Sequence, residues 1–171
     1  MHILITGASG SGTTALGRAL ATELQFAHLE SDDYHYLPTQ PKYRRLRDRA
    51  ERLSLLKCDL DVLRDVVLSG SIVGWGNEVE DMFDLIVFLY LPKEIRLQRL
   101  IGRSAENSPS PHPDFLKWAA QYDVGRQMGR SLARHNAWLS QRACPVLRLE
   151  TDQTVAERLS LVLQALPDPA P

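Results

Sequence analysis

A glycine-rich run near the start of the chain carries the clearest chemical signal in the sequence. Residues 7–14 read GASGSGTT and fit the phosphate-binding template G-x-x-x-x-G-K-[ST] at both glycines and at the final hydroxyl residue. Glycines let such a loop turn its backbone N–H groups inward, and the N-terminus of a following helix adds positive partial charge. The sequence therefore predicts a phosphate-binding loop made of Gly7, Ala8, Ser9, Gly10, Ser11, Gly12, Thr13 and Thr14.

The run departs from the template at the lysine, because that position holds Thr13. Backbone N–H groups and a helix N-terminus can bind phosphate without a lysine, and the hydroxyl of Thr14 remains as a ligand for Mg²⁺. Transfer of a phosphoryl group also needs positive charge around its oxygens. Arginines from elsewhere in the chain are the candidates for that charge.

Basic side chains gather in three segments. Residues 42–52 carry six basic side chains against two acidic ones, which could bind an anionic substrate or form a solvated helix face. The second segment has arginines at i, i+3 and i+7 of one helix face, and the third repeats them at i+4. These two sets, each of which could also be surface decoration, are Arg96, Arg99 and Arg103, and Arg126, Arg130 and Arg134.

Carboxylates follow the second strand-like run, residues 26–30. Glu30, Asp32 and Asp33 stand at its carboxyl end, where open α/β sheets place the residues that contact ligands. The competing interpretation is an ordinary acidic turn that caps a helix.

The elements that must position these residues alternate along the chain. Strand-like runs at 2–6, 26–30, 66–70, 85–91 and 145–150 are separated by helix-like segments, which predicts a parallel sheet with helices on both faces. The run LIVFLYL at 85–91 is apolar without alternation, as a strand buried on both faces requires.

The helix-like segments have recognisable ends and breaks. Leucines at 16, 20 and 24 predict a first helix, and the region 46–63 predicts a long one that breaks once. A helix follows Pro92, the stretch 104–113 is typical of a loop, and Thr154 with Glu157 forms a capping box before a last helix.

Composition limits the remaining possibilities. A length of 171 residues suits one domain, and a net charge of -1 argues against a nucleic-acid polymer or an anionic membrane as partner. The longest apolar run is too short to span a bilayer, and no signal peptide precedes the first strand. Two cysteines make no disulfide framework, so we expect a cytoplasmic protein whose oligomeric state the sequence leaves open.

With these motifs the chain resembles the small P-loop kinases of the nucleoside-monophosphate-kinase class, which includes adenylate, shikimate and gluconate kinases. The resemblance rests on GASGSGTT, LESDDYHYLP and RLQRLIGR, and on the order of elements along most of the chain. It implies a single α/β domain over 1–171 with the three-layer P-loop NTPase fold: a five-stranded parallel sheet, helices on both faces and a short lid. It also implies ATP and Mg²⁺ as cofactors.

The resemblance further implies site roles. Thr14 and Glu30 would hold the metal, and Asp32 would orient or deprotonate the acceptor, with Asp33 as the reserve for a one-residue shift. Helices within 42–65 would bind the acceptor, and residues 103–125 would form the lid. The arginines expected to bind substrate are Arg44, Arg45, Arg96 and Arg99, and those expected to face the phosphates are Arg130 or Arg134.

Three functions compete. The first is a kinase that transfers the γ-phosphoryl group of ATP to a small metabolite or nucleotide. The second is a nucleotide-binding regulatory or adaptor protein that lost efficient catalysis together with the lysine. The third and most distant is an NAD(P)-dependent dehydrogenase, against which the glycine spacing and the lack of a Tyr-x-x-x-Lys pair both argue.

Overall fold

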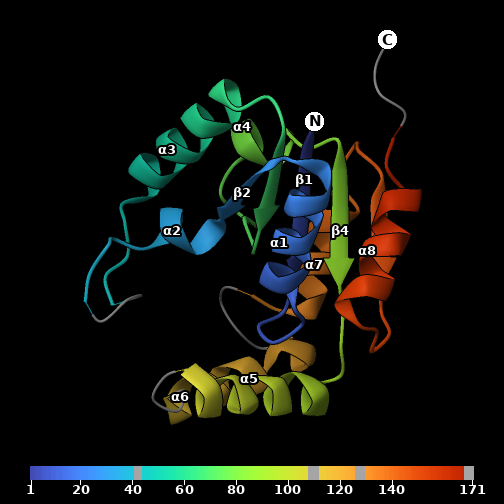
Figure 1. Cartoon of the computed structure of the whole chain (residues 1–171). Helices are drawn as coiled ribbons and strands as arrows, with labels where there is room; N and C mark the ends of the chain where they lie inside the picture. Colours follow the sequence, from blue (N-terminus) through green and yellow to red (C-terminus); the bar gives the residue numbers. More distant parts are fainter. Residues whose placement is uncertain (41–43, 108–111, 126–129, 168–171) are drawn as a thin grey trace.

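Five parallel strands form the centre of the protein. The computed structural model describes residues 1–40, 44–107, 112–125 and 130–167. In it the strands lie in the order β2-β3-β1-β4-β5 (Figure 1). Their bounds are His2–Gly7 for β1, Ala27–Glu30 for β2, Val66–Ser69 for β3, Leu85–Leu89 for β4 and Val146–Leu149 for β5. The predicted five-stranded parallel sheet is confirmed.

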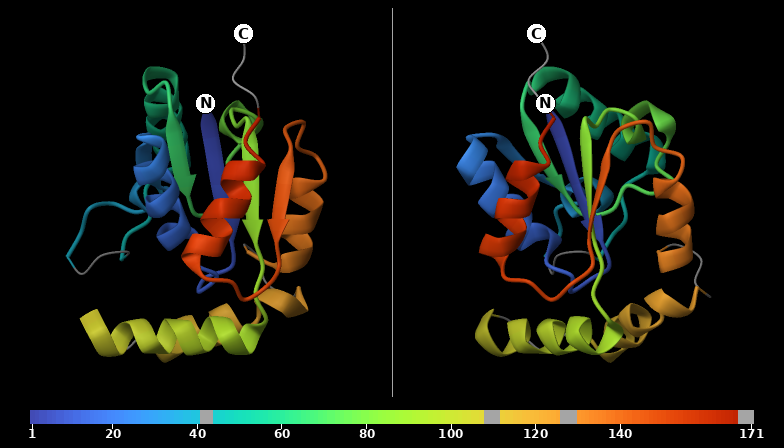
Figure 2. Two further views of the ribbon diagram at one scale, coloured as in Figure 1. Left: turned by 45° about the vertical axis from the view of Figure 1, so that its right-hand side comes forward. Right: turned by 90° about the vertical axis from the view of Figure 1, so that its right-hand side faces the viewer.

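Helices cover both faces of this sheet, as the uninterrupted apolar run of β4 requires. On one face, Leu16 and Leu20 of α1 (Thr13–Leu24) and Val162 of α8 (Val155–Gln164) pack against apolar side chains of β1 and β4. Side chains of α3 (Arg49–Val62), α4 (Asn77–Glu80) and α7 (Leu132–Leu139) pack on the other face. Figure 2 shows the resulting three layers from two directions.

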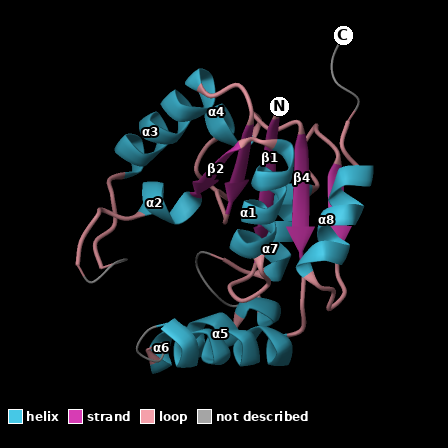
Figure 3. Cartoon of the chain, viewed as in Figure 1, coloured by secondary structure: helices cyan, strands magenta, loops and turns pink. Residues whose placement is uncertain are grey.

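The remaining helices lie at the carboxyl ends of the strands. The short helix α2 (Ser31–His35) follows β2 directly. Helices α5 (Lys93–Asn107) and α6 (Pro113–Ala120) cross beneath the sheet and are followed by the turn η1 (Tyr122–Val124) (Figure 3). The predicted lid, residues 103–125, therefore consists of the end of α5, α6 and η1, apart from 108–111, which lie outside the described residues.

Two predicted segments are wrong in part. The stretch 104–113 was expected to be a loop, but its first four residues continue helix α5. The region 46–63 holds one unbroken helix that begins only at Arg49, because the carboxylate of Asp48 accepts hydrogen bonds from the N–H groups of Ala50 and Glu51. Leu46 lies outside that helix and is exposed.

The last helix begins as expected. Thr154 and Glu157 form the capping box at the start of α8, each bonding to the other's backbone. Among the described residues, no helix is long and apolar enough to cross a membrane.

Candidate active site

The glycine-rich run forms a turn between β1 and α1. Gly10 and Gly12 have φ angles of 86° and 98°, in the left-handed region that favours glycine. A Cβ atom on Gly10 would lie 2.6 Å from the backbone oxygen of Arg96, so the turn also packs closely against α5. The Ser11 N–H donates to the carbonyl of Ala8 at 3.1 Å, which closes the turn.

The inner side of this turn borders a cleft of about 640 Å³, which we call the loop cleft. Its walls come from the turn, from α1, and from the ends of β2 and β3, with Leu100, Phe115 and Arg130 opposite. The lining residues of the turn are Gly7, Ala8, Ser9, Gly10, Thr13 and Thr14. A glycine turn at a helix N-terminus beside such a cleft fits a phosphate group.

Thr14 and Glu30 meet at one side of the loop cleft. The Thr14 hydroxyl donates to Glu30 Oε2 at 3.0 Å, while Glu30 Oε1 is buried and accepts no hydrogen bond within the described part of the chain. Burial raises the pKa of Glu30, and the bond from Thr14 and the nearby Arg18 offset part of that rise. A hydroxyl and a carboxylate side by side, with one carboxylate oxygen free of hydrogen bonds, fit a hard cation such as Mg²⁺.

A second cavity of about 350 Å³ adjoins the loop cleft, and we call it the arginine cavity. Three guanidinium groups and two tryptophans contribute to its wall. The residues that line it are Asp32, His35, Tyr36, Arg52, Ser71, Val73, Gly74, Trp75, Trp118, Arg130 and Arg134. Positive charge beside aromatic faces makes this cavity suited to a small anion.

Arg52 is held in place on the floor of the arginine cavity. Its guanidinium carbon lies 4.6 Å from the centre of the Trp75 ring, and its Nη1 is 2.6 Å from Nδ1 of His35. Because an arginine only donates, Nδ1 of His35 accepts this bond. Burial, and then the charge of Arg52, hold the pKa of His35 below its ordinary value, which favours the neutral ring.

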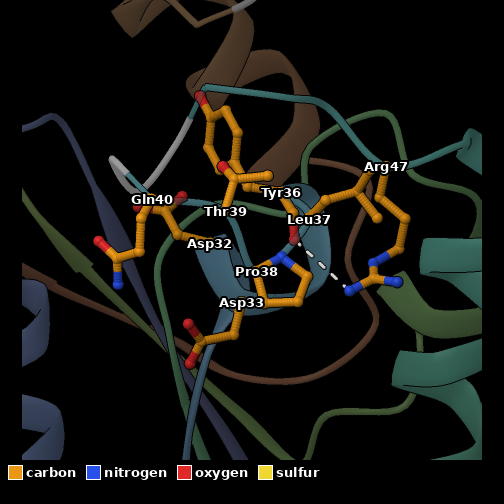
Figure 4. A pocket seen from close by; sticks show the side chains of 8 residues that line it. All are labelled: Asp32, Asp33, Tyr36, Leu37, Pro38, Thr39, Gln40 and Arg47. Carbon is orange, nitrogen blue, oxygen red and sulfur yellow. Dashed lines mark hydrogen bonds between the residues drawn. The ribbon is translucent and has the colours of Figure 1, made fainter.

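Asp32 lies where the cavities meet. It lines the loop cleft, the arginine cavity and a third cavity of about 360 Å³ shown in Figure 4. Asp33 lines the loop cleft and the third cavity but is not among the residues of the arginine cavity. Arg130 lines the loop cleft and the arginine cavity, so these two cavities share both a carboxylate and a cation.

Two predicted substrate arginines lie elsewhere. Arg44 and Arg45 are exposed and line none of these three cavities. Arg47, from the same basic segment, lines the third cavity (Figure 4). It donates to the carbonyl oxygens of Tyr34 and Tyr36. The segment thus reaches the site through Arg47 and Arg52.

Arg96 also differs from its expected role. Its side chain is fully buried and donates to the carbonyl of Leu91 at 2.9 Å, to that of Ala119 at 3.1 Å, and to Asp123 at 2.7 Å. It therefore ties α5 to α6 and to η1, and the prediction that it binds substrate is at odds with this burial. Arg99 is half-exposed and pairs with Asp152 at 2.5 Å.

The third arginine set is only partly described. Arg126 lies outside the described residues, and Arg130 precedes α7 rather than lying on it. Arg134 is on α7, and its Nη2 would be 2.7 Å from a Cβ on Gly74, so this glycine makes room for the guanidinium.

A buried histidine stands behind the arginine cavity. His135 of α7 is 1 % exposed; its Nδ1 is 2.7 Å from the Tyr122 hydroxyl, and its Nε2 is 3.2 Å from the Ser71 hydroxyl. Burial, with help from Arg130 and Arg134, lowers the pKa of His135 to about 3. It is a neutral hydrogen-bonding residue that joins η1 to the end of β3.

Sequence reasoning missed His35, Arg158 and the particular role of Arg52. His35 is three residues after Asp32, a spacing that places both on one side of a helical turn and could have indicated it. Arg158 of α8 donates from Nη1 to the carbonyl of Ser11 in the loop at 2.7 Å. No local sequence pattern marks it, because the two residues lie far apart in the chain.

Comparison with solved structures identifies the class of fold. A shikimate kinase from Acinetobacter baumannii in complex with shikimate superposes with a TM-score of 0.65 at 20% identity, covering 96% of this chain and 91% of that one. A gluconokinase from Sinorhizobium meliloti 1021 gives a TM-score of 0.57 at 19% identity, with coverages of 96% and 91%. The chain has the P-loop kinase fold.

The particular family comes from sequence comparison. Uncharacterized protein YqaC of Bacillus subtilis (strain 168) is 39% identical over 175 residues, covering 96% of this chain and 97% of that protein. The chain therefore belongs to the YqaC family. A scan against models of known protein families finds no match.

Proposed function

We propose that this protein is an ATP- and Mg²⁺-dependent phosphotransferase acting on a small anionic metabolite that carries a hydroxyl group. The observation that carries the proposal is the position of Asp32, which borders both the loop cleft and the arginine cavity. A donor phosphate in the first and an acceptor in the second would meet beside one carboxylate and one arginine, Arg130.

The residues of the loop cleft and those of the arginine cavity have different roles in this proposal. The loop from Gly7 to Thr14 binds the phosphates through its backbone N–H groups, and Thr14 and Glu30 hold the metal. ATP and Mg²⁺ would supply the transferable γ-phosphoryl group and neutralise charge on its oxygens. Asp32 would orient the acceptor hydroxyl and accept its proton during the transfer, in which ADP would be the leaving group.

The acceptor class follows from the charge of its cavity. Arg52, Arg130 and Arg134 all line the arginine cavity, against one carboxylate, Asp32. Three guanidinium groups in a cavity of about 350 Å³ favour a small carboxylate or phosphate ester over a neutral sugar. Arg130 also borders the loop cleft, where it supports the role of cation facing the transferred group.

The test is turnover on a defined panel. Purified protein with MgATP would be offered hydroxy acids, sugar acids, sugar phosphates, nucleosides and neutral sugars, with ADP formation as the readout. We expect ADP formation above the acceptor-free background only with anionic acceptors. A panel-wide failure, together with absence of ATP binding, would reject the proposal.

Thr13 supports a second candidate, a nucleotide-binding regulatory protein with little or no catalysis. It lines the loop cleft at the position where the template has a lysine. ATP binding without turnover in the unaltered protein, and a gain of turnover in Thr13→Lys, would favour this candidate. Efficient turnover in the unaltered protein would exclude it.

A further inference from the structure

A buried arginine lies directly behind the glycine-rich loop. Arg158 of α8 is 2 % exposed, and its Nη1 donates to the carbonyl of Ser11 at 2.7 Å. Its Nη2 donates to the carbonyl of Thr151 at 3.0 Å. A Cβ on Gly12 would lie 3.3 Å from Nη1, so the guanidinium packs against the loop at the residue before Thr13.

The charge of Arg158 has no carboxylate partner within 4.0 Å among the described residues. The charge of Asp152 acts on Arg158, but the hydrogen-bonded partner of that carboxylate is Arg99 at 2.5 Å. Nε of Arg158 is also buried without a hydrogen-bond partner in the described part of the chain. Burial of an unpaired cation costs free energy, and an anion bound in the loop would offset part of that cost.

The hydrogen bond from Arg158 also sets the direction of a loop N–H. In a planar trans peptide the carbonyl of one residue and the N–H of the next point in opposite directions. Drawing the Ser11 carbonyl toward α8 therefore turns the Gly12 N–H away from α8. Arg96 makes a similar, longer contact with the Ser9 carbonyl at 3.5 Å, but Asp123 neutralises its charge.

We propose that Arg158 is a positioning residue that supplies, from behind the loop, the fixed positive charge that Thr13 cannot supply from within it. It acts by orienting the loop backbone and by its charge, without touching the bound phosphates. The proposal rests on the phosphate-binding part of the proposed function, and on no acceptor or phosphoryl-transfer step.

Inorganic pyrophosphate is the appropriate probe, because it occupies the loop without requiring a base, an acceptor or turnover. Calorimetric titration would compare the unaltered protein with Arg158→Gln, Arg158→Lys and the double variant Thr13→Lys/Arg158→Gln. Arg64→Gln is the control for loss of one positive charge, since the Arg64 side chain is 95% exposed. Thermal unfolding of each variant checks that it is folded.

The expected pyrophosphate affinities of these variants distinguish the effect of the Arg158 charge from a general effect on the structure of the loop. Arg158→Gln should weaken pyrophosphate binding by about tenfold or more, and Arg64→Gln by less than about twofold. Arg158→Lys should retain part of the affinity. The double variant should regain most of it, because a lysine at position 13 restores the charge from the other side of the loop.

Three results would overturn the proposal. They are unchanged pyrophosphate affinity in folded Arg158→Gln, failure of the Thr13→Lys change to restore affinity in the folded double variant, and an equal loss in Arg64→Gln. If the unaltered protein binds pyrophosphate but neither binds nor turns over ATP, the proposed kinase function fails while the role of Arg158 can still be measured. If Arg158→Gln does not fold, Arg158→Lys alone is compared with the unaltered protein: a partial loss of pyrophosphate affinity is the expected result, and an unchanged affinity overturns the proposal.

Discussion

Asp32 and Asp33 are neighbouring carboxylates that face different surroundings, since adjacent residues on a helix do not share a face. Asp32 borders the arginine cavity as well as the loop cleft. We expect Asp32→Asn to lower kcat by about a hundredfold or more, as removal of a general base does, with little change in the Kd for ATP. Steady-state kinetics and nucleotide titration measure the two effects.

Asp33→Asn is the matched control, because it removes the same charge one residue away. It should change kcat by less than about threefold, within the range of an exposed charge change. A larger loss of kcat in Asp33→Asn than in Asp32→Asn would assign the role to the reserve residue.

Thr14 is expected to act through the metal. Thr14→Val keeps the shape of the side chain but removes the hydroxyl that lies 3.0 Å from Glu30. ADP affinity in the presence of Mg²⁺ should fall several-fold, whereas ADP affinity in excess chelator should stay the same. Equal losses under both conditions would show that the hydroxyl serves the loop structure instead.

The role of a residue could be predicted from the sequence only where backbone groups, such as the N–H groups of the glycine-rich loop, form the site. The glycine template identified the loop because glycine and turn geometry are coupled locally. The sequence shows how many basic residues the segment 42–52 has, but not which of them line the arginine cavity. Arg52 lines it, whereas Arg44 and Arg45 are exposed to solvent. Arg96 fits a helical face pattern and is nevertheless buried, because tertiary contacts with Ala119 and Asp123 decide its environment.

At the scale of elements, we expect alanine to change the free energy of unfolding in opposite directions at two glycines, Gly10 and Gly102. Gly10 has a φ of 86° and no space for a Cβ, which would meet the Arg96 carbonyl at 2.6 Å. Gly10→Ala should lower the free energy of unfolding by about 1–3 kcal/mol and weaken phosphate binding. Denaturant unfolding and pyrophosphate titration measure the two effects.

Gly102 provides the contrast. It lies within α5, and a Cβ there would meet nothing within 4 Å. Gly102→Ala should raise the free energy of unfolding by about 0.5–1 kcal/mol, since alanine restricts the unfolded chain and favours the helix. Destabilisation by this change would contradict the open space at Gly102.

Element positions were predictable where a pattern has one physical cause. The run at 85–91 became β4 because uninterrupted apolar residues suit a strand covered on both faces, and Thr154 with Glu157 capped α8 as expected. The predicted start of α3 is wrong because Leu46 continues the helical spacing of apolar residues, whereas Asp48, the N-cap residue at which the helix begins, lies two residues later. The position of the N-cap residue, and not the periodicity of apolar residues, determines where this helix begins.

The order of the strands in the sheet explains why the loop cleft and the arginine cavity adjoin each other. From β1 at the centre, the chain builds the sheet toward β3 and β2 on one side and toward β4 and β5 on the other. At such a reversal the connections diverge and leave a crevice at the carboxyl ends of the strands. The loop after β1 opens there, α2 brings Asp32 from one side, and the segment before α7 brings Arg130 from the other.

His135 links η1 to the segment after β3 beside this crevice through its contacts with Tyr122 and Ser71. From its lowered pKa we expect the stability of the protein to depend on pH. Because its folded-state pKa is about 3 and its ordinary value is 6.5, the unfolded chain binds a proton below about pH 6.5 that the folded protein does not. The free energy of unfolding should therefore fall as pH drops from about 6.5 toward 3, by up to about 1.4 kcal/mol per pH unit from this residue.

Urea unfolding at pH 7.5 and pH 5 tests this prediction in the unaltered protein, His135→Gln and His112→Gln. His28 and His35 also have lowered pKa values and contribute a fall of the same sign in all three proteins. His135→Gln should be less stable than the unaltered protein at pH 7.5, yet lose less stability on acidification, because glutamine does not titrate. His112→Gln, whose parent side chain is 73% exposed and caps α6, should lose as much stability on acidification as the unaltered protein. An identical loss on acidification in all three would mean that His135 does not stay neutral in the folded protein, and that its bonds to Tyr122 and Ser71 survive protonation.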